Sequence, residues 1–283
     1  MKERIYDYTA LDMFQQCHKK FYWRMIRHLT PKDVATALMF GRDIHEALRI
    51  YYTKGLDKAL AWFGETYKEK PFEKLRTIDN GLKMLKGYAE VYMHEPFNII
   101  ATEVGFSVPF GDIMYAGRLD ALVEWGGDLY VLEHKTTAGL RGNYFKQWSP
   151  HMQIEGYIYA AEQFTGRKCM GCVVNALEVW KDVQKTTAKT KRLADHYGRS
   201  PESRSKEQLD EFCWEVRDTV DEIRMCTREM KWRKQKHTCF SYNYECPFKQ
   251  LCMYGDDPRT LKRDYVEEVW TPYKEEEASN GKS

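Results

Sequence analysis

The residues whose types and spacing are best suited to catalysis or metal binding lie near the middle of the chain, in Gly117-Arg118-Leu119-Asp120 and Leu132-Glu133-His134-Lys135-Thr136-Thr137. Residues two apart on a strand share a face, so Glu133 and Lys135 are expected to point the same way. Two carboxylates and an ammonium on one face are costly unless they bind a cation or serve a reaction. Carboxylate oxygens suit Mg²⁺ or Mn²⁺, and a lysine beside such a metal can orient or deprotonate a water that attacks phosphorus.

The alternative for any single Glu-x-Lys pair is a surface ion pair on an exposed strand. The chain holds a second such pair, Glu229 and Lys231, in a polar stretch of helical character with no strand around it, and we assign it no role. The Gly-x-x-Asp pattern, by contrast, occurs once, and its Asp120 lies thirteen residues before Glu133. The presence of both patterns therefore favours a functional site over a chance occurrence of these residues.

Two further patterns flank this acidic centre. Gly41 and His45 form a Gly-x-x-x-His pattern, and this histidine could approach the same site as a metal ligand. Gln153 and Tyr157 are four apart and therefore share a face if the segment is helical. Each pattern is weak alone, because an isolated histidine is more often a surface or core residue and Gln-x-x-x-Tyr recurs at 250–254.

The elements that must position these residues follow from hydrophobic periodicity and turn signals. Helices are predicted over Thr9–His28 with Thr9 as the N-cap, Thr36–Thr53, Asp57–Lys68, Thr77–Tyr92, Ser149–Thr165 and much of Ser205–Lys236. Strands are predicted over Ile99–Val108, Ile113–Trp125, Asp128–Thr136 and Cys169–Val179, with Gly126-Gly127 as a hairpin turn. This order predicts a mixed α/β (α+β) fold in which helices flank a small mixed sheet.

Eight cysteines form a second set of candidate ligands. Cys239, Cys246 and Cys252 are close in sequence near the end of the chain, and Cys17 lies on the first predicted helix. Four thiolates suit an iron–sulfur cluster or zinc, and the alternative is four unrelated buried thiols. The remaining four are expected to be buried or incidental: Cys169, Cys172, Cys213 and Cys226.

The composition limits which classes of protein this chain can belong to. In 283 residues, 44 Lys and Arg balance 42 Asp and Glu, so the net charge of +2 alone does not predict nucleic-acid binding. Two basic stretches are hidden in that balance, Lys181–Lys206 and Arg224–Lys236, which could track a nucleic-acid backbone or be a solvated loop and helix face. With no long apolar run and no apolar N-terminal region, we expect no membrane span, no signal peptide and a cytoplasmic location.

Taken in order, the four patterns resemble the RecB-like branch of the PD-(D/E)XK nuclease superfamily, over roughly Tyr8 to Cys252. The resemblance implies an αβββαβ core and a DNA nuclease that depends on Mg²⁺ or Mn²⁺. It implies that His45, Asp120, Glu133 and the backbone carbonyl of His134 bind the metal. It further implies that Lys135 is catalytic and that Gln153 and Tyr157 contact DNA or support the site.

The same resemblance bears on the cysteines. AddB-type and CRISPR-adaptation nucleases hold a 4Fe–4S cluster with one N-terminal cysteine and a C-terminal trio, which implies Cys17, Cys239, Cys246 and Cys252 here. The usual trio is C-x2-C-x5-C, and this chain departs from it with six residues, Phe240–Glu245, in the first interval. Such a cluster would tie distant parts of the chain together and stabilise the fold without redox catalysis.

The leading functional hypothesis is a DNA exonuclease of phage or bacterial recombination and repair, acting on DNA with single-stranded character beside a recombination partner protein. The alternatives are a CRISPR-adaptation nuclease, a non-catalytic nucleic-acid-binding module of the same fold, and a zinc-stapled nuclease. The absence of a Gly-x4-Gly-Lys-[Ser/Thr] motif argues against a fused helicase. We expect a single nuclease domain over 1–283, with a helical part at 8–98, a catalytic sheet core at 99–180, a helical part at 181–262 that holds the cysteines, and a tail at 263–283. Polarity, strand preference and oligomeric state stay open.

Overall fold

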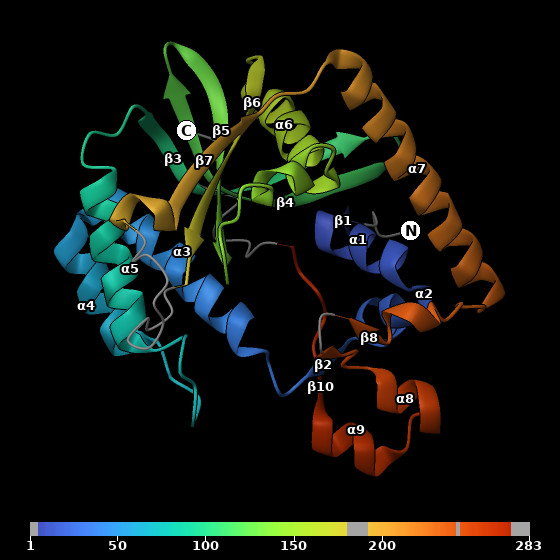
Figure 1. The fold of residues 1–283 in the computed structure, drawn as a ribbon. Coiled ribbons are helices and arrows are strands. Elements are labelled where there is room, and N and C mark those ends of the chain that lie inside the picture. Colours follow the sequence, from blue (N-terminus) through green and yellow to red (C-terminus); the bar gives the residue numbers. More distant parts are fainter. Residues whose placement is uncertain (1–4, 180–191, 242–243, 273–283) are drawn as a thin grey trace. The chain divides into compact units, whose positions relative to one another are not determined.

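A computed structural model describes residues 5–179, 192–241 and 244–272 of the chain (Figure 1). The described residues fall into two compact units. The central unit comprises those of Ala35–Val104 and Arg118–Arg204. The terminal unit comprises those of Met1–Val34, Gly105–Gly117 and Ser205–Ser279. The prediction of a single nuclease domain stays a prediction.

A mixed sheet was predicted, and the structure has six strands in it where four were predicted. Its strands are β1 (Ile5–Tyr6), β3 (Asn98–Phe110), β4 (Ile113–Trp125), β5 (Asp128–Thr137), β6 (Cys169–Glu178) and β7 (Tyr197–Glu202). Their order is β1-β4-β5-β6-β7, with β3 also paired to β4. The pairs β1–β4 and β5–β6 are parallel, whereas β4–β5 and β6–β7 are antiparallel. The mixed α/β fold class is therefore confirmed.

The hairpin between β4 and β5 has the predicted turn. Trp125 pairs with Asp128, and Gly126 and Gly127 between them have φ of 62° and 92°. Positive φ at both central positions is the geometry of a tight hairpin turn, and it explains why glycine stands at both. Further along, Ala121 pairs with Leu132. This register brings Asp120, just before Ala121, close to Glu133, just after Leu132.

The central unit places helices against β5 and β6. These helices are α3 (Thr36–Lys54), α4 (Leu56–Thr66), α5 (Ile78–Val91) and α6 (Met152–Thr165). The unit also has two short 3₁₀ turns: Tyr144–Trp148 lies between β5 and α6, and Leu193–His196 directly precedes β7. Helix α6 packs on β5 and β6, while α3 contacts β5 and α5 contacts β6. All four helices lie within two or three residues of their predicted bounds.

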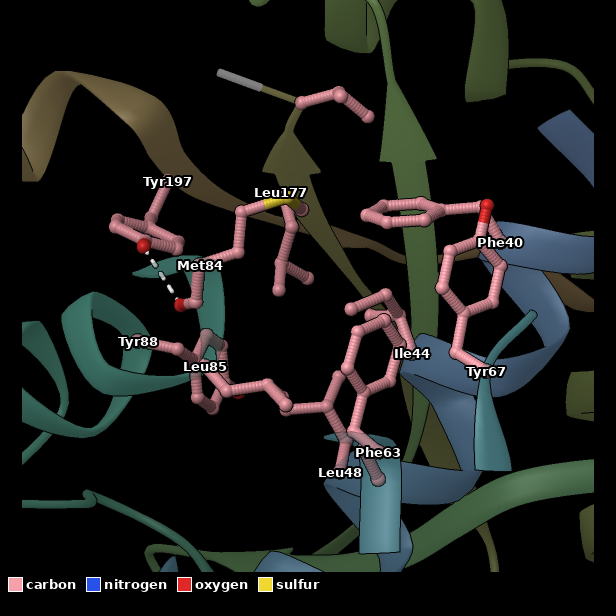
Figure 2. Close-up of a cluster of buried hydrophobic side chains, with 12 residues drawn as sticks. Phe40, Ile44, Leu48, Phe63, Tyr67, Met84, Leu85, Tyr88, Leu177 and Tyr197 are labelled. Atoms are coloured by element: carbon pink, nitrogen blue, oxygen red, sulfur yellow. Dashed lines mark hydrogen bonds between the residues drawn. The ribbon is translucent and has the colours of Figure 1, made fainter. Parts of the chain in front are cut away.

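A hydrophobic cluster holds α3, α4 and α5 on β6 (Figure 2). Helix α3 contributes Phe40, Ile44 and Leu48, which are four apart and therefore form one stripe. Leu177 of β6 packs in the same cluster, and Tyr197 of β7 donates a hydrogen bond of 2.8 Å to the carbonyl of Met84. Because α3 carries His45, this cluster fixes the helix that delivers that side chain.

The terminal unit begins differently from the prediction. Helix α1 runs over Tyr8–Gln16, and its N-cap is Asp7, whose carboxylate accepts a hydrogen bond of 2.9 Å from the N–H of Ala10, so the choice of Thr9 was wrong. The prediction of one helix to His28 was also wrong. The backbone is extended at Cys17 (φ −169°, ψ 115°), which separates α1 from α2 (His18–Phe21) and a following π-helical turn, Tyr22–Ile26.

The other elements of the terminal unit are α7 (Lys206–Glu229), a 3₁₀ turn at Lys236–Thr238, α8 (Lys249–Tyr254), α9 (Pro258–Asp264) and two small sheets. Strands β2 (Leu29–Pro31) and β10 (Tyr265–Glu267) pair antiparallel, as do β8 (Phe240–Ser241) and β9 (Tyr244–Glu245). Among the helices of the described residues, none is both long and apolar enough to cross a membrane.

Candidate active site

Asp120 is held from two sides within the central unit. The backbone N–H of His134 donates a hydrogen bond of 2.7 Å to Asp120 Oδ2, and His45 Nδ1 lies 3.3 Å from the same oxygen. Burial alone would raise the pKa of Asp120, but the charge and hydrogen bond of His45 lower it below the usual range. Burial opposes protonation of His45, and Asp120 nevertheless raises its pKa. The structure thus joins two of the predicted site residues as an ion pair.

Glu133 and Lys135 share the face of β5 that meets α6, as their spacing predicts. Lys135 Nζ donates hydrogen bonds of 2.7 Å to Glu133 Oε1 and to Gln153 Oε1. Gln153 Nε2 in turn donates to Glu133 Oε1 at 3.1 Å and to the hydroxyl of Tyr157 at 3.0 Å. The predicted Gln-x-x-x-Tyr and Glu-x-Lys residues therefore form one hydrogen-bonded group.

The second oxygen of Glu133 has a different environment. Glu133 Oε2 is buried and has no hydrogen-bond partner among the described residues. Burial, and next the charge of Asp120, raise the pKa of Glu133 to about 7. A buried carboxylate oxygen without a partner is costly, and a bound cation would remove that cost.

Two glycines of the predicted patterns allow close approach of the chain. A Cβ at Gly41 of α3 would lie 3.0 Å from Thr136 Oγ1 on β5. A Cβ at Gly117 of β4 would lie 2.8 Å from the ring of Phe106 on β3. The absence of a side chain at Gly41 thus lets α3, with His45 one turn further on, sit close to β5.

Sequence reasoning missed a third carboxylate, Glu103 of β3. It forms an ion pair of 2.7 Å with Arg118, and burial and then the charge of Asp120 raise its pKa to about 7. It also missed Trp148, whose ring centre lies 4.9 Å from Lys135 Nζ. Nothing in the spacing of Glu103 singles it out, because only the pairing of β3 with β4 brings it near Asp120.

A buried polar network, also missed, lies on the opposite face of β5. Asn175 Nδ2 lies 2.7 Å from His134 Nδ1 and donates to the Tyr88 hydroxyl at 3.0 Å, while Arg199 Nε donates to Asn175 Oδ1 at 3.0 Å. Arg199 also pairs with Glu95. The arginine fixes the orientation of the amide, so His134 Nδ1 is the acceptor. Burial lowers the pKa of His134 to about 3, which keeps the ring neutral.

Two arginines of the first basic stretch are bound within the fold, whereas Arg192 is exposed and pairs with Asp195. Arg199 is bound as above, and the Arg204 side chain, 1% exposed, pairs with Glu155 at 3.1 Å and donates to the carbonyl of Trp148 at 2.7 Å. These two arginines therefore serve the fold instead of tracking a nucleic-acid backbone. The part of the stretch at 180–191 lies outside the described residues.

The four candidate cysteines lie in the terminal unit and are free thiols. Cys17 stands at the break between α1 and α2, where its sulfur accepts a hydrogen bond of 3.4 Å from the N–H of Gln235. Trp23 Nε1 donates to Cys252 Sγ at 3.4 Å. The six-residue insertion at 240–245 contains strands β8 and β9. The N–H of Cys246, just after it, donates a hydrogen bond of 2.9 Å to the carbonyl of Cys239, just before it.

Among the other cysteines, Cys226 Sγ lies 3.6 Å from His18 Nδ1. Cys169, Cys172 and Cys226 are buried and Cys213 is partly buried. Burial raises the pKa of Cys169 to about 11 and that of Cys172 further above its usual value, which favours inert thiols. Within the ranges that the structure describes, no group of three or more His, Cys, Asp or Glu side chains is arranged to hold a metal ion. Both predicted ligand sets therefore stay predictions.

The order of elements around this site, α3-β3-β4-β5-α6-β6, is the predicted αβββαβ core. A family model described as the PD-(D/E)XK nuclease superfamily matches residues 8–253. The chain belongs to this superfamily. The match includes every residue assigned above to the acidic centre and all four candidate cysteines, and membership supports a nuclease.

Two solved structures are similar to this chain. One is a protein from Eubacterium rectale with a provisional exonuclease name, and its sequence is 12% identical to this chain. The match has a TM-score of 0.53 and covers 81% of this chain and 84% of that chain. An alkaline exonuclease from Laribacter hongkongensis is 13% identical, with a TM-score of 0.36 over 66% of this chain and 90% of that one. Among curated protein sequences, none matches. The first likeness shows a shared fold.

Proposed function

We propose that this PD-(D/E)XK superfamily member is a divalent-metal-dependent DNA exonuclease that hydrolyses phosphodiester bonds. The observation that carries the proposal is the unpartnered, buried Oε2 of Glu133, beside the ionised Asp120 and the ammonium of Lys135. A structural carboxylate would be expected to have both oxygens satisfied. The exonuclease name of the similar Eubacterium rectale structure favours an exonuclease over an endonuclease.

The donor set fits Mg²⁺ or Mn²⁺. Asp120, Glu133 and the backbone carbonyl of His134 supply the hard oxygen ligands that these ions prefer, and His45 adds a nitrogen that suits Mn²⁺. Mg²⁺ is usually held by one or two protein carboxylates, and it keeps waters and binds substrate phosphate as well. When bound, such an ion lowers the pKa of a coordinated water and offsets the charge that develops on the phosphate.

The chain's own residues then position the reactants. An ammonium has three N–H donors, and Lys135 uses two of them on Glu133 and Gln153. The remaining donor can hold a water or a phosphate oxygen at a fixed point next to the carboxylates. Gln153 fixes Lys135 and Glu133 together and is itself bonded to Tyr157, so the helix α6 sets the orientation of the whole group.

The test is digestion of end-labelled single- and double-stranded DNA by the full chain with Mg²⁺, with Mn²⁺ and with EDTA. We expect metal-dependent shortening from one end, which also reports polarity. Lys135→Ala should slow it by about 10²–10⁴-fold, and Lys231→Ala, in the second Glu-x-Lys pair, is the matched control that should not. Equal absence of cleavage in wild type and Lys135→Ala with both metals would favour the non-catalytic nucleic-acid-binding module.

A structural 4Fe–4S cluster held by Cys17, Cys239, Cys246 and Cys252 is part of the same proposal. Cys17 and Cys252 already accept N–H hydrogen bonds at sulfur, an interaction that tunes cluster thiolates. The charges of Cys252 and Cys17 both contribute to a raised pKa of Cys246, where burial is the largest cause, so these three thiols lie within electrostatic reach. The hairpin β8–β9 keeps Cys239 beside Cys246 despite the longer interval.

Anaerobic purification followed by an absorption spectrum and iron, sulfide and zinc analysis tests the cluster. A brown protein with four irons per chain supports it, and Cys252→Ser should lose both colour and thermal stability while Cys213→Ser keeps them. A colourless protein with stoichiometric zinc would replace iron by zinc, and a metal-free stable protein would reject a metal at the cysteines. The resemblance to the RecB-like branch supports a setting in DNA recombination or repair.

A further inference from the structure

The loop between α4 and α5 carries an unusually placed aromatic side chain. Phe72 is 97% exposed and has a positive φ of 65°. A bulky residue in this backbone region is a steric outlier, and an exposed ring gains no burial in return. The ring borders an open hollow of about 560 Å³, within the range of ligand sites, whose other lining includes Thr36, Lys70, Lys74 and Leu75.

The ends of this loop are rigidly anchored. Tyr67, at its start, is buried beside Phe40 of α3 (Figure 2). The two ring centres lie 5.4 Å apart. The Tyr67 hydroxyl donates 2.7 Å to the carbonyl of Arg76, and Asn80 Nδ2 donates 2.6 Å to that of Leu75. The loop that carries Phe72 therefore starts and ends at fixed points.

The charges of the loop are arranged for an anion. Its two carboxylates are used internally, because Glu73 Oε1 accepts three backbone N–H bonds of 2.9–3.2 Å from residues 74–76 and Glu69 accepts one from Ile78. The ammonium-bearing Lys68 and Lys74 are exposed on either side of Phe72. An exposed ring between exposed cations is the pattern that binds an unpaired base with its neighbouring phosphates.

The loop is also placed relative to the acidic centre by α3. Thr36 borders the hollow, and His45 lies nine residues further along the same helix, about 13–14 Å at 1.5 Å per residue. That distance spans roughly four stacked nucleotides at about 3.4 Å each, or fewer if the strand is stretched. One strand could therefore reach both points.

We propose that Phe72 is a base-stacking residue of a single-stranded nucleic-acid subsite, two to four nucleotides from the bond that is cut, with Lys68 and Lys74 contacting its phosphates. The number of nucleotides between Phe72 and the cleaved bond rests on the proposed function, whereas stacking of a base on Phe72 can be measured without cleavage.

The experiment measures binding of a fluorescein-labelled single-stranded 12-mer to the full chain by anisotropy, in EDTA so that no metal-dependent cleavage occurs. We expect Phe72→Ala to weaken binding about 10-fold or more and Phe72→Trp to retain it. Phe72→Asn should also weaken binding while keeping the melting temperature at or above that of wild type, because asparagine tolerates positive φ. Trp214→Ala, at an aromatic that is 65% exposed on α7, is the matched control and should bind as wild type does.

A 12-mer of the same length with abasic positions separates stacking from other effects. Wild type and Phe72→Ala should bind the abasic strand with equal affinity. On an intact strand with 2-aminopurine at one position near its end, wild type should quench the 2-aminopurine fluorescence and Phe72→Ala should not. Equal affinities of wild type and Phe72→Ala, or an equal loss on the abasic strand, would overturn the inference. Binding that depends on Phe72 in a chain that cuts no DNA would sink the proposed exonuclease and leave the stacking site standing.

Discussion

The backbone N–H of His134 donates a hydrogen bond of 2.7 Å to the carboxylate of Asp120, and this contact links the two strands that carry the acidic centre. Burial raises the pKa of Glu133, and the contact places Asp120 where its charge raises it further, a cost that the fold accepts at this position. Perturbed pKa values caused by buried like charges cluster at functional sites. The predictions below test that relationship and the elements that maintain it.

Removal of the Lys135 ammonium should reduce cleavage far more than it reduces stability. We expect Lys135→Ala to lower kcat on a DNA substrate by about 10²–10⁴-fold, the usual contribution of a positioned proton-transfer group. Lys231→Ala should stay within twofold of wild type, because Lys231 is exposed and pairs only loosely with Glu229 at 3.6 Å. Single-turnover kinetics with saturating enzyme measures this, and equal loss in both variants would contradict the assignment.

The metal-free protein should lose stability as the pH rises through neutrality, owing to Glu133. Its folded pKa is raised to about 7 from an ordinary value of 4.5, so its contribution is most favourable below pH 4.5 and is lost as the pH rises through 7. Glu133→Gln keeps the shape without the charge. We therefore expect the melting temperature of Glu133→Gln relative to wild type to be higher at pH 8 than at pH 5 in EDTA.

Addition of Mg²⁺ or Mn²⁺ supplies the control for that comparison. A cation at Glu133 should raise the melting temperature of wild type at pH 8, and this gain should be much smaller in Glu133→Gln. A pH-independent difference between the two proteins in EDTA would show that the carboxylate does not titrate as described.

The network behind β5 should support the site through Asn175. Asn175→Ala removes the amide between His134, Tyr88 and Arg199, leaving buried polar groups unsatisfied, and we expect a loss of roughly 1–3 kcal/mol in the free energy of unfolding. Urea denaturation measures it. Asn98→Ala, at the exposed start of β3, is the control and should change stability by less than about 0.5 kcal/mol.

Two helical glycines should respond to alanine in opposite directions. A Cβ at Gly81 of α5 would lie 2.1 Å from the ring of the buried Phe63, so Gly81→Ala should destabilise by roughly 1–3 kcal/mol. A Cβ at Gly64 of α4 meets no atom within 4 Å in the part of the chain that is described, so Gly64→Ala should stabilise by about 0.5–1 kcal/mol. Thermal melts of the two variants decide this, and a shared sign would show that the packing of α4 against α5 differs from that described.

The sequence by itself determined the local parts of this protein. Gly126-Gly127 specified a hairpin because only glycine readily takes two successive positive φ values, and the hairpin then fixed Asp120 near Glu133. Period-two alternation likewise fixed Glu133 and Lys135 on one face. Asp7 and Thr9 are two residues apart and either side chain could cap α1. The local pattern predicted Thr9, whereas the N-cap in the structure is Asp7.

Only the tertiary structure decided which distant groups meet. His45 reaches Asp120 because a hydrophobic stripe fixes α3 and because Gly41 permits close contact with Thr136, relations that no local pattern encodes. Glu103, Arg199 and Phe72 carry no motif, and their roles depend on strand pairing, burial and backbone strain. Periodicity reports which face of an element is buried, whereas the partner across that face is chosen by packing of the whole chain.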